Sequence, residues 1–224
     1  MRRKKEKEIM DGKIQVAAFA QGMKNSPSNI LFLNYLAKKT IFNERKILDL
    51  GCGTSEISIA LLSQNPSIEK IVGIDASQRM IDLGAERVTC LNMAEKITLI
   101  KGKIPGIEKL LKEKNFDIII SRSLLHHIPN PNSFWKELEK ISKPKTEIFV
   151  CDFIRPKSVL HAKKITAKAN FRNKQVKKDF YNSLLASFTI EEIKEQLKQI
   201  KLNLEIKEVN SLFFIVQRNK RTKR

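Results

Sequence analysis

The sequence predicts an α/β fold, in which a mostly parallel sheet carries helices on both faces. Short apolar segments alternate with segments of helical period along most of the chain, which is the order of strand–helix–strand units. The apolar segment 46–50 leads directly into a glycine-rich turn and then a helix, and the next apolar segment ends on Asp75. A glycine turn followed by an acid at the end of the next strand is typical of sheets that hold an adenosine-bearing cofactor.

The elements are expected in a regular order. Strands are predicted at 47–50, 70–75, 97–101, 116–121 and 147–153, with a terminal pair at 204–209 and 212–217. Helices are predicted at 55–63, 77–92, 131–142 and 190–200, with Ser77 and Thr189 as N-caps and Pro131 in a first turn. The segment 116–121 is nearly all apolar, as expected of a strand that is buried on both faces. The first forty residues and the segment 155–188 lie outside this alternation and are expected to be helical.

Length and composition exclude several classes of protein. A chain of 224 residues with 42% hydrophobic and 30% charged residues suits one soluble globular domain. The three cysteines include no C-x-x-C pair, which argues against a disulfide framework or a zinc knuckle and predicts a reducing compartment. No apolar run approaches the ~20 residues that a membrane span needs. We therefore expect a cytoplasmic protein, and we expect no bound metal.

The charge is strongly positive and unevenly distributed. The net charge is +19, of which the segments 1–8 and 218–224 together carry +8. A further block, 155–178, holds nine lysines and arginines and no acid. These blocks predict either a footprint for nucleic acid or another polyanion, or solvated lysines and disordered tails. The second interpretation is favoured, because charge blocks at termini are usually disordered tail.

The glycine turn has features that narrow the kind of cofactor. Gly51 and Gly53 allow the backbone to turn sharply and to approach a ligand closely. Glu56 stands where the dinucleotide fingerprint has its third glycine, and its carboxylate would oppose a pyrophosphate at the start of the helix. This argues against NAD or FAD. Asp75 can accept hydrogen bonds from both hydroxyls of a ribose.

At this point the chain resembles a known family. Four motifs occur in the order typical of class I S-adenosylmethionine-dependent methyltransferases: LDLGCGTSEIS, VGIDASQRMIDLGAE, FDIIISRSLLHHIPNP and EIFVCDFIRP. The resemblance covers residues 30–217. Within the family, the chain is most similar to a subgroup whose substrates are undefined. It implies a Rossmann-like three-layer sandwich with a seven-stranded, mostly parallel sheet, an antiparallel last strand and helical lid additions.

The resemblance also implies which residues bind S-adenosyl-L-methionine. Asp49 and the backbone of Gly51, Cys52 and Gly53 would face the methionine half of the cofactor. Asp75 would bind the ribose. Ala76 and Met80 would pack on the adenine side, and the segment 121–125, with Ser121 and Ser123, would close over the sulfonium.

Two positions depart from the pattern of the family. Ser55 stands where many members have a third glycine, which narrows the turn and leaves its backbone donors intact. Gly102 and Lys103 follow the third strand, where many members have glycine and aspartate. Because Lys103 cannot accept a hydrogen bond from the adenine amino group, backbone or apolar contacts are expected to hold the adenine.

Three residues are candidates for chemistry at the acceptor. His126 and His127 follow the fourth strand and could deprotonate a hydroxyl or position an acceptor. Alternatively, His126 packs under the cofactor and His127 caps the following loop. Asp152, at the end of the fifth strand, could hold an amine or hydroxyl of the substrate, or could pair with Arg155.

The segment 155–188 is expected to form a helical lid over the site. In a helix, Lys164, Lys168 and Arg172 would share one face, which could receive an anionic substrate or simply be solvated. Three aromatic side chains are expected near the cofactor and the substrate: Phe19, Phe180 and Tyr181.

The favoured function is methyl transfer to an oxygen or nitrogen of a small molecule. An RNA methyltransferase, acting on tRNA or rRNA through the basic lid and tails, is the alternative. A non-catalytic cofactor-binding module is the third possibility. The expected organisation is an N-terminal basic tail and helical cap at 1–40, a methyltransferase domain at 41–217 and a basic C-terminal tail at 218–224.

Overall fold

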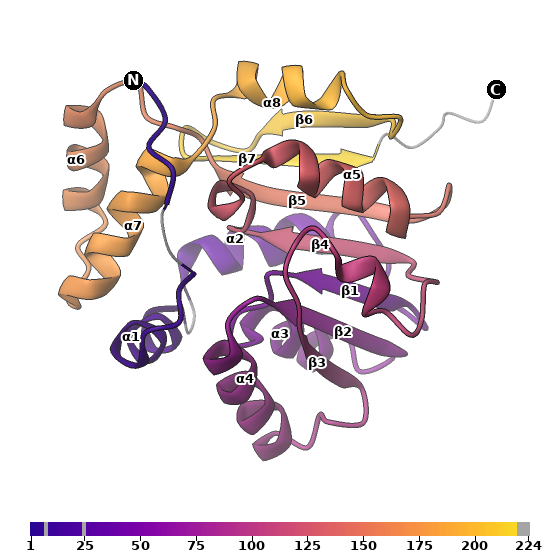
Figure 1. The fold of residues 1–224 in the computed structure, drawn as a ribbon. Helices are drawn as coiled ribbons and strands as arrows, with labels where there is room; N and C mark the ends of the chain where they lie inside the picture. The colour runs from indigo at the N-terminus through magenta and orange to yellow at the C-terminus, as the bar shows by residue number, and fades with distance from the viewer. Residues whose placement is uncertain (7–8, 24–25, 219–224) are drawn as a thin grey trace.

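A computed structural model describes residues 1–6, 9–23 and 26–218 of the chain (Figure 1). Parts of the two expected basic tails, residues 7–8 and 219–224, lie outside the described residues. No helix within the described ranges is both long enough and apolar enough to cross a membrane.

A seven-stranded sheet forms the middle layer of the molecule (Figure 1). Its strands are β1 (Lys46–Leu50), β2 (Lys70–Asp75), β3 (Ile97–Lys101), β4 (Ile118–Arg122), β5 (Glu147–Phe153), β6 (Leu204–Glu208) and β7 (Phe213–Arg218). They lie in the order β3-β2-β1-β4-β5-β7-β6. Strand β7 runs antiparallel to both of its neighbours, β5 and β6, and the pairs among β1–β5 are parallel, so the predicted sheet with an antiparallel last strand is confirmed.

Helices cover both faces of this sheet. They are α1 (Lys13–Met23), α2 (Pro27–Ala37), α3 (Glu56–Gln64), α4 (Gln78–Cys90), α5 (Pro131–Ile141), α6 (Val159–Lys168), α7 (Lys174–Ala186) and α8 (Ile190–Leu197), with short 3-10 turns η1 (Ile107–Lys109) and η2 (Leu125–His127). The helices α2, α3 and α4 contribute to the apolar core on one face. The helices α5 and α8 contribute to the core on the other face.

The position of β4 in the middle of the sheet explains why most of its residues are apolar. Ile119 packs in one core, whereas Ile118 and Ile120 pack in the other. Successive residues of a strand point to opposite faces, so a strand covered on both sides needs apolar residues at every position. On the α5 side, Trp135 is fully buried and its indole N–H donates to Gln196 at 2.8 Å.

The ends of the elements differ from the prediction by a few residues. The predicted strand 116–121 is found at Ile118–Arg122, since residue 116 is buried but the pairing with β1 begins only at Ile118. An apolar residue that is buried beside a strand extends the apolar pattern in the sequence, even where its backbone does not pair with the neighbouring strand. The helix predicted to end at residue 200 ends at Leu197. Both predicted N-caps are confirmed, because Ser77 accepts from Met80 N–H and Thr189 accepts from Glu192 N–H.

A helical layer stands beyond the carboxyl ends of the central strands. Figure 1 shows α1, α6 and α7 grouped on the side toward which β1 and β4 point. Helix α7 contacts α1, α6 and η2. The first residues of the chain join this layer, because Lys4 N–H donates to the carbonyl of Leu185 at 2.9 Å.

Candidate functional site

The turn after β1 has a backbone that requires glycine. Gly51 and Gly53 have φ values of 73° and 54°, in the left-handed region that side chains rarely adopt. A Cβ atom on Gly51 would lie 2.9 Å from the side chain of Leu124. Ser55 adopts φ 68°, so it takes the left-handed conformation at the position where the family pattern has a glycine. The backbone of the turn is thus preserved despite the substitution.

Asp75 ties this turn to the end of β2. Its carboxylate accepts from Gly53 N–H and from Ser77 N–H, both at 2.9 Å. Burial raises the pKa of Asp75, although these two N–H groups oppose the shift. The carboxylate therefore fixes the relative positions of the two loops that a cofactor would touch.

Asp49 lies beneath the turn and is almost fully buried. Its carboxylate accepts from the hydroxyl of Ser58 at 2.7 Å. Burial raises the pKa of Asp49 to about 7, although the hydrogen bond from Ser58 opposes the shift. A cationic group placed beside Asp49 would favour its ionised form.

A cavity of about 560 Å³ lies at the carboxyl ends of β1, β2 and β4. This volume is within the range of small-molecule and cofactor sites. The following predicted site residues line it: Asp49, Gly51, Cys52, Gly53, Asp75, Ala76, Met80, Gly102, Lys103, Ser123, His126 and His127. Ser121 and Asp152 do not line the cavity.

Ser121 is fully buried within the sheet, and its hydroxyl donates to the carbonyl of Leu50 at 3.0 Å. It therefore links β4 to β1 and does not face the cavity. Ser123 does line the cavity and has φ 55°. Lys103 lies exposed at the edge of the cavity, where Met80 and Ile104 supply apolar surface.

Asp152 acts on His126 from behind. Its carboxylate accepts from the backbone N–H of His126 at 3.0 Å and lies 2.7 Å from His126 Nδ1. Burial alone would raise the pKa of Asp152, but the charge and hydrogen bonds of His126 and the N–H of Phe153 outweigh it and lower that pKa. The expected alternative, pairing with Arg155, is wrong, because Arg155 pairs with Glu192 at 2.6 Å.

His127 forms a second pair with a carboxylate from a distant part of the chain. Its Nδ1 lies 2.5 Å from Glu6, which also accepts from the hydroxyl of Ser183 at 3.1 Å. Burial alone would lower the pKa of His127, but the hydrogen bond and the charge of Glu6 outweigh it and raise that pKa. The sequence analysis missed Glu6, because a glutamate in a charged terminal segment carries no local signal of a site.

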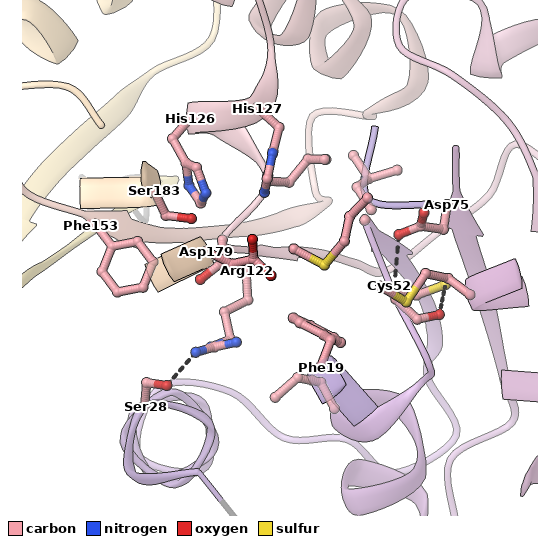
Figure 2. Close-up of a pocket in the computed structure, with 18 of the residues that line it drawn as sticks. Phe19, Ser28, Cys52, Asp75, Arg122, His126, His127, Phe153, Asp179 and Ser183 are labelled. Atoms are coloured by element: carbon pink, nitrogen blue, oxygen red, sulfur yellow. Dashed lines mark hydrogen bonds between the residues drawn. The ribbon is translucent and has the colours of Figure 1, made fainter. Parts of the chain in front are cut away.

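Arg122 also lines the cavity; it belongs to the predicted segment 121–125 but was not singled out from the sequence. It ends β4, and its guanidinium donates to the hydroxyl of Ser28 (Figure 2). Burial lowers the pKa of Arg122. A signal was present, since an arginine directly after a doubly buried strand must end in a polar site or at the surface.

Aromatic side chains close the cavity on the helical side. Phe19 from α1, Phe153 at the end of β5 and Phe180 from α7 line it, with Phe171 beside Phe180 at a ring distance of 5.0 Å. Figure 2 shows Phe19 and Phe153 near Arg122. Phe19 and Phe180 thus lie where expected, whereas Tyr181 does not line the cavity.

The expected basic helix face is not found, because α6 ends at Lys168 and Arg172 lies in the loop before α7. Lys164, Lys168 and Arg172 are exposed, and none of them lines the cavity. Of the two interpretations of these side chains, the solvated one agrees with the structure.

Comparison with known proteins assigns a family. A family model described as a methyltransferase domain matches residues 41–211. The chain is 27% identical over 125 residues to a demethylmenaquinone methyltransferase of Lactobacillus johnsonii. The matched region covers 53% of this chain and 50% of the relative. It is 31% identical over 123 residues to a ubiquinone biosynthesis O-methyltransferase of Coxiella burnetii, covering 54% and 49%. The chain thus spans about half the length of the curated relatives that it matches.

A solved structure shares nearly the whole fold. The plantazolicin methyltransferase BamL, solved with a triazolic desmethylPZN analog and SAH, superposes with a TM-score of 0.69 at 17% identity. The match covers 92% of this chain and 91% of that one. At this identity the likeness concerns the fold alone, but the family model covers most of the chain. The chain therefore belongs to the family of methyltransferase domains.

Proposed function

We propose that the protein transfers the methyl group of S-adenosylmethionine to an oxygen or nitrogen atom of a small molecule. The observation that carries this proposal is the pairing of Asp75 with the glycine turn, which prepares a ribose site at the open end of β2. Membership of the methyltransferase-domain family supports the reaction. The relatives named above support a small acceptor, since their names refer to quinone biosynthesis. SAH bound to BamL supports the cofactor.

The part of the cavity at the ends of β1 and β2 offers a suitable contact for each part of the cofactor. Asp49 would receive the cationic methionine end, because the positive charge compensates the burial of this carboxylate. Asp75 uses one lone pair on each oxygen for a backbone N–H, and the remaining lone pairs can accept from the ribose hydroxyls. Met80 and Ile104 would pack on the adenine, which agrees with an adenine held without a carboxylate.

The acceptor would lie between η2 and the helical layer. His126 and His127 line the cavity on this side, and Asp152 orients the ring of His126. Methyl transfer requires in-line alignment of the acceptor lone pair with the methyl–sulfur bond and removal of water from the cation. The acceptor lone pair would form the new bond to the methyl carbon, the carbon–sulfur electron pair would stay on sulfur, and the proton of the acceptor would pass to solvent.

The size and charge of the cavity favour a small acceptor over RNA. Residues of α1, of α7 and of the N-terminal segment line it, whereas Lys164, Lys168 and Arg172 do not. We further propose that residues 1–40 and 155–188 act together as its cover. The buried guanidinium of Arg122 supports an anionic or strongly polar group on the acceptor.

Thermal stabilisation by S-adenosylmethionine tests the cofactor. The wild-type protein is expected to gain thermal stability when the cofactor is added, and Asp75→Ala is expected to lose this gain. Asp82→Ala is the matched control, because Asp82 is an exposed aspartate on the neighbouring helix α4. Failure of the cofactor to stabilise the wild type would contradict the proposal.

Transfer of labelled methyl groups to fractionated cell extract tests the acceptor class. Label is expected in the small-molecule fraction. Label in the RNA fraction or in protein would overturn the small-molecule assignment and leave the methyltransferase assignment in place.

A further inference from the structure

Three side chains meet at the acceptor side of the cavity in a pattern that can hold a metal ion. Glu6, His126 and His127 each direct one ligand atom inward, and these atoms lie within 4.8 Å of one another. Figure 2 shows the two imidazole rings side by side, facing Ser183 and the interior of the cavity. Two imidazole nitrogens and a carboxylate oxygen form a donor set that zinc and other first-row transition metals prefer.

One nitrogen of this group lacks a hydrogen-bond partner among the described residues. His126 Nε2 is buried and has no hydrogen-bond partner among the described residues. A buried polar atom without a partner is costly and calls for a ligand. The ion pair between Glu6 and His127 accounts for two of the three side chains, but it leaves this nitrogen unsatisfied.

The ring of His126 is already held as a metal-binding histidine usually is. Its Nδ1 lies 2.7 Å from the carboxylate of Asp152, so the Nδ1–H tautomer leaves a lone pair on Nε2. Ligating histidines generally donate their other ring N–H to a carboxylate or carbonyl, which fixes the ring and increases its basicity. Ser183 holds Glu6 in a similar way, through a hydrogen bond of 3.1 Å.

The N-terminal segment is anchored so that Glu6 reaches this position. The guanidinium of Arg3 donates to the carbonyls of Ala186, His126 and Ile128 and lies 4.0 Å from the centre of the Phe188 ring. The anchor is three residues before Glu6 and contacts the backbone of His126 itself. The carboxylate is therefore placed beside the histidines by a fixed segment.

We propose that Glu6, His126 and His127 bind a divalent transition-metal ion, with Zn²⁺ as the best match, and that the cavity supplies its remaining ligand. Ligand atoms around a tetrahedral zinc lie about 3.3 Å apart, given bonds of about 2.0–2.1 Å. The 4.8 Å limit on the ligand-atom separations requires closure by at most about 1.5 Å, whereas Glu6 and His127 Nδ1, which lie 2.5 Å apart, would separate slightly to admit the ion. This proposal departs from the expectation, drawn from the sequence, that no metal is bound.

The role of the metal follows from its place in the cavity, and this part rests on the proposed methyl transfer. An acceptor hydroxyl that occupies the open position would become more acidic, as water does on zinc. It would release its proton to solvent, and the resulting oxygen lone pair would take the methyl group while the carbon–sulfur electron pair stays on sulfur. His126 and His127 would then act as ligands and not as proton acceptors.

Titration of the untagged full-length protein with Co²⁺, after treatment with a chelator, tests the site. The wild type is expected to bind a single equivalent with the visible absorption of a low-coordinate cobalt ion, and Zn²⁺ is expected to displace it. His126→Gln, His127→Gln and Glu6→Gln are each expected to weaken binding at least ~10-fold, and Asp152→Asn about 10–100-fold. His161→Gln is the matched control, since His161 is an exposed histidine on α6 outside the cavity, and it is expected to bind as the wild type does.

Two results would overturn the metal site. One is absence of saturable binding in the wild type, and the other is binding that survives in the His126→Gln/His127→Gln double variant. Glu6→Gln separates the metal site from a simple ion pair between Glu6 and His127. If the residues form only an ion pair, the variant would lose thermal stability, and neither the wild type nor the variant would take up metal. Thermal stabilisation by S-adenosylmethionine, measured on the same samples, separates the two proposals. A response to the cofactor without metal binding removes the metal site alone, whereas metal binding without a response to the cofactor removes the methyltransferase assignment alone.

Discussion

The two halves of the cavity are built in different ways. The half that is proposed to hold the cofactor, here called the cofactor half, is made by backbone groups and contacts within one stretch of chain, from Asp49 to Met80, where Asp75 accepts from Gly53 N–H and Ser77 N–H. The acceptor half is made by side chains from segments far apart in sequence, as the pairs Glu6–His127 and His126–Asp152 show. A site built on backbone geometry tolerates few changes in shape, whereas a site built on paired side chains can change its chemistry by single substitutions.

The largest effect is expected from a change in the backbone of the cofactor half. Gly51→Ala would force a Cβ into a residue with φ 73°, 2.9 Å from Leu124. We expect loss of the thermal response to S-adenosylmethionine and a decrease of about 1–3 kcal/mol in the free energy of unfolding, measured by urea titration. Gly12→Ala is the control, because a Cβ there meets no atom closer than 3.6 Å. A variant that binds the cofactor normally would contradict the assigned role of the turn.

A smaller and more selective effect is expected in the acceptor half. Asp152→Asn removes the charge behind His126 and leaves the glycine turn untouched. Methyl transfer is expected to fall about 10–100-fold while cofactor affinity stays unchanged, since Asp152 positions another side chain and does not touch the cofactor. Radiolabel transfer and isothermal titration calorimetry on the same protein measure the two quantities. Equal losses in both would show that the two halves are not separable.

Cofactor affinity and stability are expected to depend on pH through Asp49. Burial raises the pKa of this residue to about 7. Below this pH the free protein holds a proton on Asp49 that the unfolded chain has already lost, so the free energy of unfolding falls as pH rises from about 4 to about 7. A cationic cofactor requires the ionised carboxylate. Its affinity should therefore increase about tenfold between pH 6 and pH 8, with proton release below pH 7.

Calorimetry in buffers of different ionisation enthalpy measures this proton release. Asp49→Asn should show weaker binding without the pH dependence. Affinity of the wild type that stays constant over this pH range would show that Asp49 is already ionised in the free protein.

The smallest effect is expected at the anchor of the N-terminal segment. Arg3→Ala removes hydrogen bonds to three carbonyls and is expected to lower the free energy of unfolding by about 1–2 kcal/mol. Methyl transfer should fall a few-fold, because Glu6 is then less firmly placed, and cofactor affinity should not change. Arg2→Ala is the control, since Arg2 is exposed. Equal behaviour of the two variants would show that the segment has no part in the site.

The prediction from sequence succeeded where the signal is local. The spacing of Asp49, Gly51, Gly53 and Asp75 was sufficient to bring these four residues to one cavity, because the turn and the strand ends are close in sequence and in space. It was less successful for Ser121, which the motif places in the site and the structure places between two strands. The motif gave the right segment, but the alternation of the strand decides which side chain faces the cavity.

The acceptor half shows the limit of this approach. Glu6 carries no motif, and Arg122 lies in a motif that does not single it out. Their contacts with Ser183, His127 and Ser28 form only when the chain folds. The pairing predicted between Asp152 and Arg155 was plausible from their proximity in sequence. It fails because α8 supplies Glu192 to Arg155, while η2 brings His126 over Asp152.

The sequence by itself therefore determined the fold class, the order of the strands along the chain and the cofactor turn, since periodicity, caps and glycine spacing act over a few residues. The tertiary structure decided which polar groups meet: Glu6 with His127, His126 with Asp152, and Arg122 with Ser28. The physical reason is that a charge changes its meaning with its neighbours. An isolated glutamate near a terminus is solvated, whereas Glu6 is paired with His127 at the wall of the cavity.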